Sequence, residues 1–132
     1  MFETKITPRV SETDGVGHVN NTFLPVWFEA GRHELFGLFN PDFSFKNWHM
    51  VIIKTTVTYK NQIYFGEDVL IRCWIREIGN SSLKLYEEAW QGKRLCATNE
   101  AIYVNFNMRE NKSERIPGGI RKELEKHCED LR

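Results

Sequence analysis

The segment from Thr22 to Phe39 restricts the fold more than any other stretch of the chain, because its pattern predicts a helix that is apolar on nearly every side. The apolar side chains that cover its circumference are Phe23, Leu24, Val26, Trp27, Phe28, Ala30, Leu35, Phe36 and Leu38. A helix that is apolar all round is usually a buried one. The remainder of the chain therefore has to supply the material that covers it.

Signals for both ends of this helix are present. A short side-chain oxygen at Asn20, Asn21 or Thr22 can accept an otherwise unpaired N–H of the first turn. Pro25 is compatible with that first turn, where a missing N–H costs little. The stop signals at the other end are Gly37, Asn40 and Pro41.

From Met50 onward the apolar period changes to two, which is typical of half-buried strands. Gly79-Asn80-Ser81-Ser82 and Gln91-Gly92-Lys93 predict turns between antiparallel neighbours. The expected strands run from Met50 to Lys60, Val69 to Arg76, Leu83 to Trp90 and Leu95 to Phe106. A short strand from Phe2 to Val10 precedes them, with Pro8 suited to its end, and a charged, peripheral helix from Ile120 to Leu131 follows them.

These elements predict an α+β fold. A curved antiparallel sheet of about five to six strands is the only other material in the chain that can wrap one long central helix. At 132 residues the chain has the size of a single domain, 1–132, that buries its core without disulfides or metals. Apolar faces left over on such a sheet favour a homo-oligomer, either a dimer or a tetramer.

Composition excludes several classes of partner. Basic and acidic residues number 18 each, so no overall field points to nucleic acid or to a membrane surface. Cys73, Cys96 and Cys128 are far apart and lack metal-ligand spacing, so we expect reduced thiols and no metal. The N-terminus lacks the pattern of a secretion signal, and no run approaches the ~20 apolar residues of a membrane span. We therefore expect a cytoplasmic protein that needs no cofactor.

The stretch from Ser11 to Asn21 gathers an acid, two glycines, an imidazole and two amides at the entrance to the predicted helix. Asp14 stands before Gly15, where an aspartate commonly bonds its own backbone in a turn, but a carboxylate here is also a candidate base or nucleophile. His18 is either a structural residue of the turn or a group that contacts substrate. Unpaired N–H groups at a helix start can polarise a carbonyl.

Three segments carry a family resemblance. Arg9 to Asn21, followed by Phe23, Trp27-Phe28-Glu29-Ala30-Gly31-Arg32 and Phe36, resembles the signature of hotdog-fold acyl-CoA thioesterases of the 4-hydroxybenzoyl-CoA thioesterase type. That signature consists of an Asp, a short gap, Gly-His-Val-Asn-Asn, an aromatic residue and Glu-x-x-Arg on the central helix. Tyr64 to Val69 is similar to the family's Tyr-Gly-Asp-x-Val turn, and Ile116-Pro117 is similar to its exit from the last strand.

The resemblance implies hydrolysis of an acyl-CoA to a free acid and coenzyme A. Asp14 matches the family's base or nucleophile, and Asn21 matches the position whose backbone N–H contacts the thioester oxygen. Gly17 allows close approach of the chain to that group, and His18 completes the expected catalytic set. The expected substrate-binding set consists of Asn20, Thr22, Lys60 and Arg109, the last two as grips for the phosphates of coenzyme A.

Several alternatives stay open at this point. Glu29 is a rival carboxylate, although it lies some ~10 Å from the helix start by simple rise, and it is spaced to pair with Arg32. A hotdog hydratase or dehydratase and a non-catalytic acyl-binding domain share the same fold. The acyl chain length, and the choice between coenzyme A and acyl carrier protein, also stay open.

Overall fold

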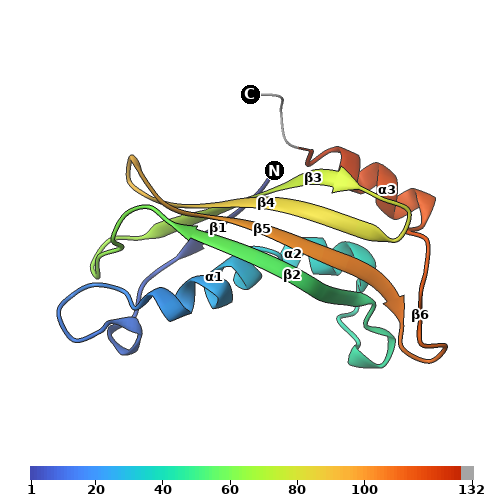
Figure 1. The fold of residues 1–132 in the computed structure, drawn as a ribbon, viewed down its shortest axis with the longest axis horizontal. Coiled ribbons are helices and arrows are strands. Elements are labelled where there is room, and N and C mark those ends of the chain that lie inside the picture. Colours follow the sequence, from blue (N-terminus) through green and yellow to red (C-terminus); the bar gives the residue numbers. More distant parts are fainter. Residues whose placement is uncertain (129–132) are drawn as a thin grey trace.

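A curved antiparallel sheet laid across a helical segment forms the frame of the molecule in a computed structural model, which describes residues 1–128 (Figure 1). The strands are β1 (Phe2–Ile6), β2 (Met50–Tyr59), β3 (Val69–Ile78), β4 (Ser82–Gln91), β5 (Arg94–Asn107) and β6 (Lys112–Ser113). The strand order is β1-β3-β4-β5-β2, all neighbours are antiparallel, and the short β6 pairs with the end of β5. The α+β hotdog architecture predicted from the sequence is confirmed.

The central helix is present but interrupted. A turn of 3-10 helix, Asn21–Phe23, leads into α1 (Leu24–Ala30), and α2 (His33–Phe39) continues in the same direction along the sheet. Pro25 lies at the start of α1, as predicted. At the interruption, a Cβ on Gly31 would lie 2.5 Å from Cγ2 of Ile71 on β3. The backbone therefore comes so close to the sheet at this point that only glycine fits.

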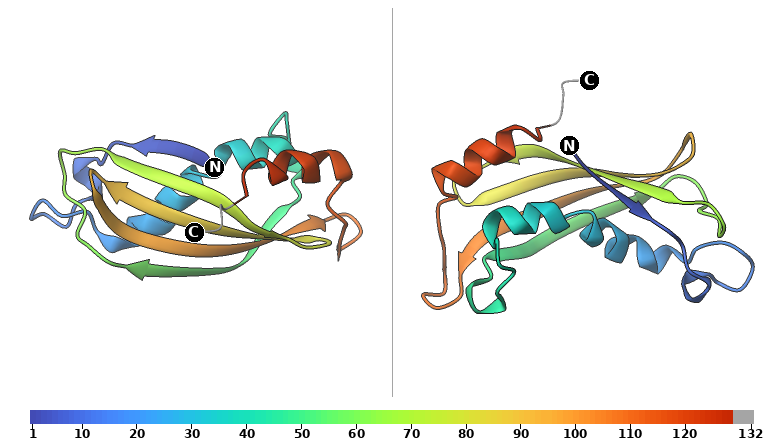
Figure 2. Two further views of the ribbon diagram at one scale, coloured as in Figure 1. Left: turned by 90° about the horizontal axis from the view of Figure 1, so that it is seen from above. Right: turned by 180° about the vertical axis from the view of Figure 1, so that it is seen from behind.

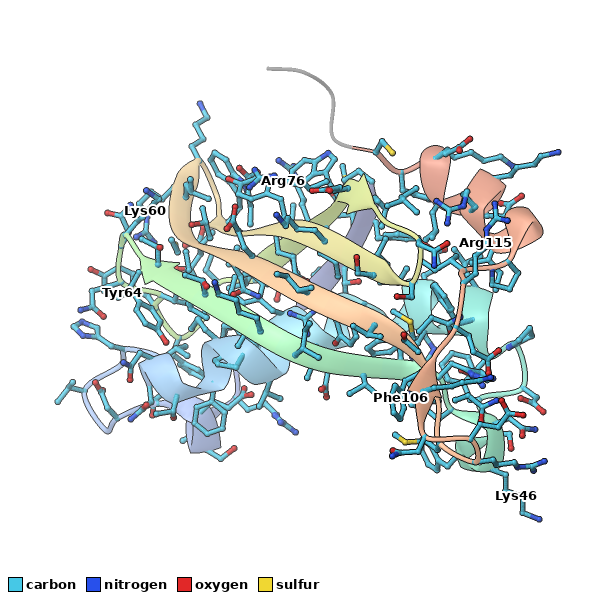
Figure 3. The ribbon with its side chains drawn as sticks, turned by 45° about the vertical axis from the view of Figure 1, so that its right-hand side comes forward. Lys46, Lys60, Tyr64, Arg76, Phe106 and Arg115 are labelled. Atoms are coloured by element: carbon cyan, nitrogen blue, oxygen red, sulfur yellow. The ribbon has the colours of Figure 1, made fainter. Side chains whose placement is uncertain are left out.

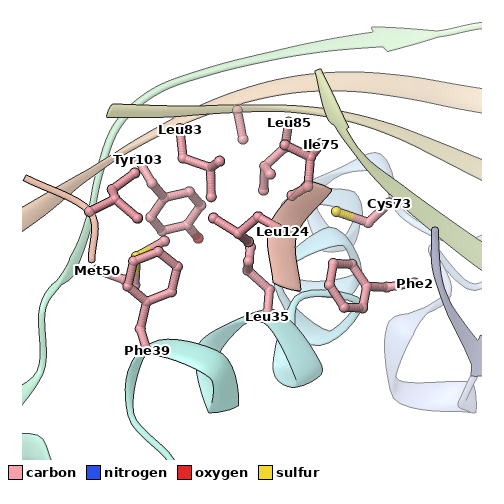
Figure 4. Packing of buried hydrophobic residues seen from close by; sticks show 12 residues of the cluster. Phe2, Leu35, Phe39, Met50, Cys73, Ile75, Leu83, Leu85, Tyr103 and Leu124 are labelled. Atoms are coloured by element: carbon pink, nitrogen blue, oxygen red, sulfur yellow. The ribbon is translucent and has the colours of Figure 1, made fainter. Parts of the chain in front are cut away.

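Two apolar clusters fill the space between helix and sheet. One cluster surrounds α2 and includes Leu35, Phe39, Leu83 and Tyr103 (Figure 4). The other surrounds α1 and includes Trp27, Phe28, Ile71 and Ala89. Along much of β3, β4 and β5 these side chains alternate with more exposed residues of the outer face. The period-two pattern of the sequence therefore reflects a sheet that is covered on one face.

Arg32, at the helix interruption, makes a buried ion pair with Glu87 of β4. Its Nε and Nη2 donate to the two carboxylate oxygens at 2.7 Å, and its Nη1 donates to the Tyr103 hydroxyl at 3.0 Å. Burial alone would lower the pKa of Arg32, but the bonds from Glu87 outweigh burial and raise that pKa. The spacing that would allow Arg32 to pair with Glu29 is not used: the partner of Arg32 is the buried carboxylate of Glu87 on β4, and Glu29 is exposed.

The terminal segments differ from the sequence-based expectations. β1 ends at Ile6 rather than Val10. The last helix, α3 (Gly118–Glu125), is not peripheral, because Leu124 is fully buried in the cluster around α2. Figure 2 shows α3 at the same end of the molecule as α2. The helix predicted to reach Leu131 ends earlier, and positions 129–132 lie outside the described residues.

β2 forms one edge of the sheet. Its pairing with β5 shifts register between Ile52 and Lys54, so the strict alternation expected along this strand is broken there. Ile52, Ile53 and Tyr59 are 43%, 60% and 51% exposed. This edge combines open backbone groups with exposed apolar side chains, which is the arrangement that invites a further strand.

None of the helices within residues 1–128 has the length and apolar content needed to cross a membrane.

Candidate active site

The loop that carries Asp14 is a small hairpin at the start of the helical segment. Thr13 and Val19 form an antiparallel bridge, and the Asp14 N–H donates to the His18 carbonyl at 3.0 Å. Gly15 and Gly17, between them, have φ values of +89° and +85°. Glycine adopts this left-handed region without steric cost, so the two glycines set the shape of the hairpin.

Hydrogen bonds on both sides hold the hairpin in place. The Val19 N–H donates to the Ile63 carbonyl at 2.8 Å, and the Phe65 N–H donates to the Gly17 carbonyl at 2.9 Å. On the other side the Asn20 N–H donates to the Glu12 carbonyl at 2.8 Å. The hairpin is thus fixed between the loop that follows β2 and the segment that precedes it.

Beside the hairpin is an open cleft of about 650 Å³. Asp14, Asn20 and Asn21 line it from the helix side, and Tyr59 and Lys60 line it from the end of β2. The remaining lining residues are Val19, Leu24, Asn61, Gln62, Ile63, Cys96 and Ala97. The cleft is therefore a polar entrance, bordered by apolar and small side chains, at the point where the helical segment begins.

Asp14 is exposed in this cleft and has one local hydrogen bond. Its Oδ1 accepts from the Val16 N–H at 3.2 Å, which is the turn role that the sequence left open. Its Oδ2 has no hydrogen-bond partner among residues 1–128. The turn role and a chemical role are consequently compatible, because one oxygen holds the loop and the other has no partner on a residue that lines the cleft.

Asn20 and Asn21 divide two tasks at the start of the helical segment. The Oδ1 of Asn20 accepts from the Thr22 N–H at 2.9 Å and from the Thr22 hydroxyl at 2.8 Å, so Asn20 is the cap. The N–H of Asn21 has no acceptor in the part of the chain that the structure describes. The Tyr59 hydroxyl donates to the Asn21 carbonyl at 3.2 Å and holds this residue against β2. The Asn21 N–H is thus a free donor on a fixed backbone.

The other predicted site residues lie at different distances from the cleft. Lys60 lines it. His18 is half-buried, and its ring packs edge-on against the ring of Tyr64, with the two centroids 5.1 Å apart. This contact fits a structural residue of the turn, which is one of the two roles that the sequence left open for His18. Thr22 donates to the Oδ1 of Asn20 with its N–H and its hydroxyl, as described above. Arg109 lies in the β5–β6 turn, between the labelled Phe106 and Arg115 at the end of the molecule opposite Lys60 and Tyr64 (Figure 3), so this chain does not bring it to the cleft.

Glu12 is a site-supporting residue that the sequence did not reveal. It is 3% exposed, and its carboxylate accepts from the Trp27 Nε1 at 2.9 Å and from the Arg9 N–H at 2.7 Å. Burial acts to raise the pKa of Glu12, but the bonds from Trp27 and Arg9 prevail and lower it. An ionised Glu12 therefore ties the Asp14 hairpin to α1. Its partner Trp27 is fifteen positions away, so no local pattern indicates the pairing.

Gln91 is a second such residue, at the end of β4. Gln91 is 1% exposed, and its side chain binds the loop after β2 at three points. Its Oε1 accepts from the Tyr64 N–H at 2.9 Å, and its Nε2 donates to the carbonyls of Tyr64 and Glu67 at 2.8 and 2.9 Å. This loop in turn holds the Asp14 hairpin. Gln91 thus fixes the cleft from the β4–β5 turn, where the sequence indicated only a turn residue.

Metal and thiol chemistry have no evident donors in this cleft. Within residues 1–128 no group of three or more His, Cys, Asp or Glu side chains is placed to hold a metal ion. Cys96 lines the cleft, but burial raises the pKa of its thiol. A protonated thiol is a poor nucleophile. The polar groups at the cleft include the Asp14 carboxylate and the backbone N–H of Asn21.

Comparison with known proteins identifies the family and the fold of the chain. A family model described as the thioesterase-like superfamily matches residues 8–124. The structure of a predicted thioesterase from Bacillus stearothermophilus is 56% identical, covers 99% of this chain and 98% of its own, and superposes with a TM-score of 0.95. A thioesterase from Thermus thermophilus, complexed with coenzyme A and zinc, is 23% identical over 92% of this chain and 95% of its own, with a TM-score of 0.81.

A curated relative of the chain is the uncharacterized protein YsmA of Bacillus subtilis (strain 168). It is 28% identical over 116 residues, which cover 85% of this chain and 77% of the relative. The family model spans most of the described residues, from the segment before the Asp14 hairpin to α3. The chain belongs to the thioesterase-like superfamily.

Proposed function

We propose that the protein hydrolyses the thioester of an acyl-CoA to a free acid and coenzyme A in the cleft beside Asp14. One observation carries the proposal: the unengaged Oδ2 of Asp14 and the free N–H of Asn21 belong to residues that line the same cleft. Thioester hydrolysis needs one group to deliver the oxygen nucleophile and one to stabilise the oxyanion. The Asp14 carboxylate is suited to the first task, and the Asn21 N–H is suited to the second.

In the proposed reaction the carbonyl oxygen accepts a hydrogen bond from the Asn21 N–H, which stabilises the negative charge that develops on it. Asp14 either removes a proton from the attacking water or attacks the carbonyl carbon itself. The carbon–sulfur bond then breaks, and the thiolate of coenzyme A leaves and gains a proton. On the nucleophilic route, water hydrolyses the resulting anhydride and restores the Asp14 carboxylate.

The supporting roles follow from position. Asn20 and Thr22 shape the entrance beside the Asn21 N–H, and Gly17 and His18 hold the hairpin that presents Asp14. Lys60 provides a cation at the opposite wall. The Thermus thermophilus thioesterase that shares this fold was crystallised with coenzyme A, and this supports coenzyme A as the acyl carrier.

The proposal includes a homo-oligomer that is built through the open edge of β2. Two copies related by a two-fold axis can pair their β2 strands antiparallel, which would cover Ile52 and Ile53 and satisfy the open backbone groups. Antiparallel pairing places opposite ends of the two sheets side by side. Arg109 of one copy then approaches the cleft of the other, where it is the proposed second cation for the phosphates. Light scattering distinguishes a dimer from a tetramer.

The three cysteines are free, which fits a reducing compartment. The proposal accordingly assigns the enzyme to the cytoplasm. A fractionation of the source cells with an antibody against the protein tests this assignment.

A steady-state screen tests the proposed activity. Release of free thiol is followed for acyl-CoA esters from acetyl to palmitoyl and for benzoyl-CoA, and each acyl group is also offered on acyl carrier protein. We expect thiol release from at least one coenzyme A ester at a rate proportional to enzyme concentration. Hydration of enoyl-CoA without thiol release would replace the proposal with a hydratase, and binding without any turnover would replace it with an acyl-binding domain.

A further inference from the structure

A second open groove, of about 790 Å³, lies between β1 and the helical segment. The first residues of β1, from Phe2 to Thr4, line it on one side, and residues of α1 and α2 line it on the other. Figure 2 shows β1 next to the junction of the two helices. None of these lining residues borders the cleft beside Asp14, and the proposed reaction uses none of them. We call this second cavity the β1 groove.

The open edge of β1 borders this groove. β1 is the last strand of the sheet on the side opposite β2, and within residues 1–128 its backbone pairs with β3 alone. The N–H and C=O groups on its other side are therefore available for a further strand. Extended peptides bind to many proteins by adding a strand to such an edge. The β1 groove thus has the backbone groups that an extended segment needs.

The helical wall of the β1 groove offers exposed apolar surface. Val26 and Ala30 lie four residues apart on α1, so they share one face of the helix. Val26 is 58% exposed, and Ala30 is also exposed. The aliphatic stem of a lysine or arginine can cover surface of this kind while its charged end stays in water. A long basic side chain therefore suits this wall.

The charge of the β1 groove decides between its possible occupants. Glu29 and Glu34 line it, are exposed, and make no ion pair within the described residues. Glu3, by contrast, is paired with Arg72 at 3.0 Å. With His33 counted as neutral, the groove carries two uncompensated negative charges in a chain of zero formal net charge. A second copy seated on a two-fold axis would bring the same carboxylates together, whereas a basic segment complements them.

We propose that the β1 groove binds an extended, lysine- or arginine-rich peptide segment of another protein. The segment adds to β1 as a further strand, its basic side chains reach Glu29 and Glu34, and their stems lie on Val26 and Ala30. The inference goes beyond the proposed hydrolysis and does not depend on it, because the groove and the cleft share no lining residue. Such binding joins the protein to a partner while the cleft stays open.

A synthetic peptide tests the inference. The probe is a heptapeptide of alternating lysine and threonine with both ends blocked, and its control has glutamate in place of lysine. Calorimetry at physiological salt measures the Kd of each with the full-length protein. We expect the lysine peptide to bind and the glutamate peptide not to bind. Glu29→Gln/Glu34→Gln should weaken binding of the lysine peptide about tenfold, which is about 1.4 kcal/mol and is expected for two exposed ion pairs.

Two further variants locate the binding. Glu67→Gln/Glu125→Gln is the matched control, because it removes two exposed carboxylates that lie outside the groove and make no ion pair within the described residues. It leaves the Kd unchanged. Val26→Lys places a cation in the groove at an exposed helix position that lysine suits, and it should weaken binding at least about tenfold. Equal Kd values for the unmodified protein and Glu29→Gln/Glu34→Gln would overturn the inference, as would equal binding of the two peptides.

Methylation of the peptide backbone tests the strand pairing. One version of the lysine peptide is N-methylated at its lysine residues, and another at its threonine residues. Since alternate N–H groups of a strand point to the same neighbour, one version should lose binding and the other should keep it. Unchanged affinity in both versions would mean that charge alone holds the peptide, and this would contradict the proposed strand.

Light scattering tests the remaining occupant, a second copy of the chain. Val26→Lys should have the same mass in solution as the unmodified protein. A lower mass would show that another copy covers the β1 groove through Val26, and the inference would then be wrong.

Discussion

Glu87 and Asp14 are two carboxylates that face different parts of the helical segment, and their surroundings differ completely. Glu87 is fully buried, and its oxygens accept from Arg32 twice at 2.7 Å and from the Asn99 Nδ2 at 2.8 Å. Asp14 is exposed and accepts one hydrogen bond, from Val16 at 3.2 Å. A buried carboxylate whose two oxygens already accept hydrogen bonds supports the structure. A carboxylate in a cleft with an oxygen that accepts none is available to a substrate.

The same difference extends to the neighbourhoods of the two groups. Around Glu87, the network continues from Asn99, whose Oδ1 accepts from the Thr55 hydroxyl at 2.7 Å, so a polar connection runs from the helix interruption to the edge strand. Around Asp14, support comes from backbone bonds and from the side chains of Glu12 and Gln91, whose own partners are distant in the sequence. Changes near Glu87 should therefore alter stability, and changes near Asp14 should alter activity.

Removal of the Glu87 carboxylate has the largest expected effect on stability. Glu87→Leu leaves the Arg32 guanidinium buried without its counter-ion, which costs about 3–5 kcal/mol in the free energy of unfolding. Urea unfolding followed by tryptophan fluorescence measures the loss. Arg32→Met/Glu87→Leu removes both charges and should recover most of it. A double variant no more stable than the single one would show that the pair itself, and not the unpaired charge, carries the stability.

Gly31→Ala has the next largest effect. The added Cβ meets Ile71 at 2.5 Å, so the helical segment or β3 has to shift at a cost of about 1–3 kcal/mol. Gly118→Ala is the control, because its Cβ meets nothing within 4 Å, and it should change stability by at most about 0.5 kcal/mol. Equal unfolding midpoints for the two variants would contradict the close approach at Gly31.

Trp27→Phe removes one donor from Glu12 and has a pH-dependent effect. The folded-state pKa of Glu12 lies below its ordinary value of 4.5, so the ionised form stabilises the fold. That contribution is complete above about pH 4.5 and is lost as the pH falls through the lower folded-state pKa. At pH 7 we expect Trp27→Phe to cost about 1.5–3 kcal/mol through the lost bond. The part of this cost that is due to the Glu12 charge should disappear in acid. If the difference in the free energy of unfolding between Trp27→Phe and the unmodified protein grew on acidification, the lowered pKa of Glu12 would be contradicted.

The comparison also shows which features a sequence reveals. The fold and the turn that carries Asp14 were predictable because they rest on local patterns: the apolar period, the turn glycines and the helix caps. The Asp-to-Asn-Asn spacing added the family resemblance. The partners of Arg32, Glu12 and Gln91 were not, because these bonds join positions from fifteen to fifty-five residues apart. The helix interruption was missed for the same reason, because it lies where Gly31 comes close to Ile71 of β3. The register shift in β2 was also missed.

Asp14→Asn has the smallest expected effect on stability. The Asn side-chain oxygen still accepts from the Val16 N–H, as the Asp14 Oδ1 does. The free energy of unfolding should therefore change by at most about 0.5 kcal/mol. Chemical unfolding beside the unmodified protein measures this, and a loss of several kcal/mol would show that Asp14 is a structural residue of the hairpin.

The turnover of that same variant is the most direct test of the account. Its matched control is Asp42→Asn, because the Oδ1 of Asp42 accepts from the Ser44 N–H at 3.0 Å in an equivalent turn that lies outside the cleft. With the best acyl-CoA, we predict that Asp14→Asn lowers kcat by about 10²–10⁴-fold, as expected for the loss of a general base, and that Asp42→Asn leaves kcat unchanged. Full turnover by the folded Asp14→Asn variant would contradict the assignment of Asp14 to the reaction.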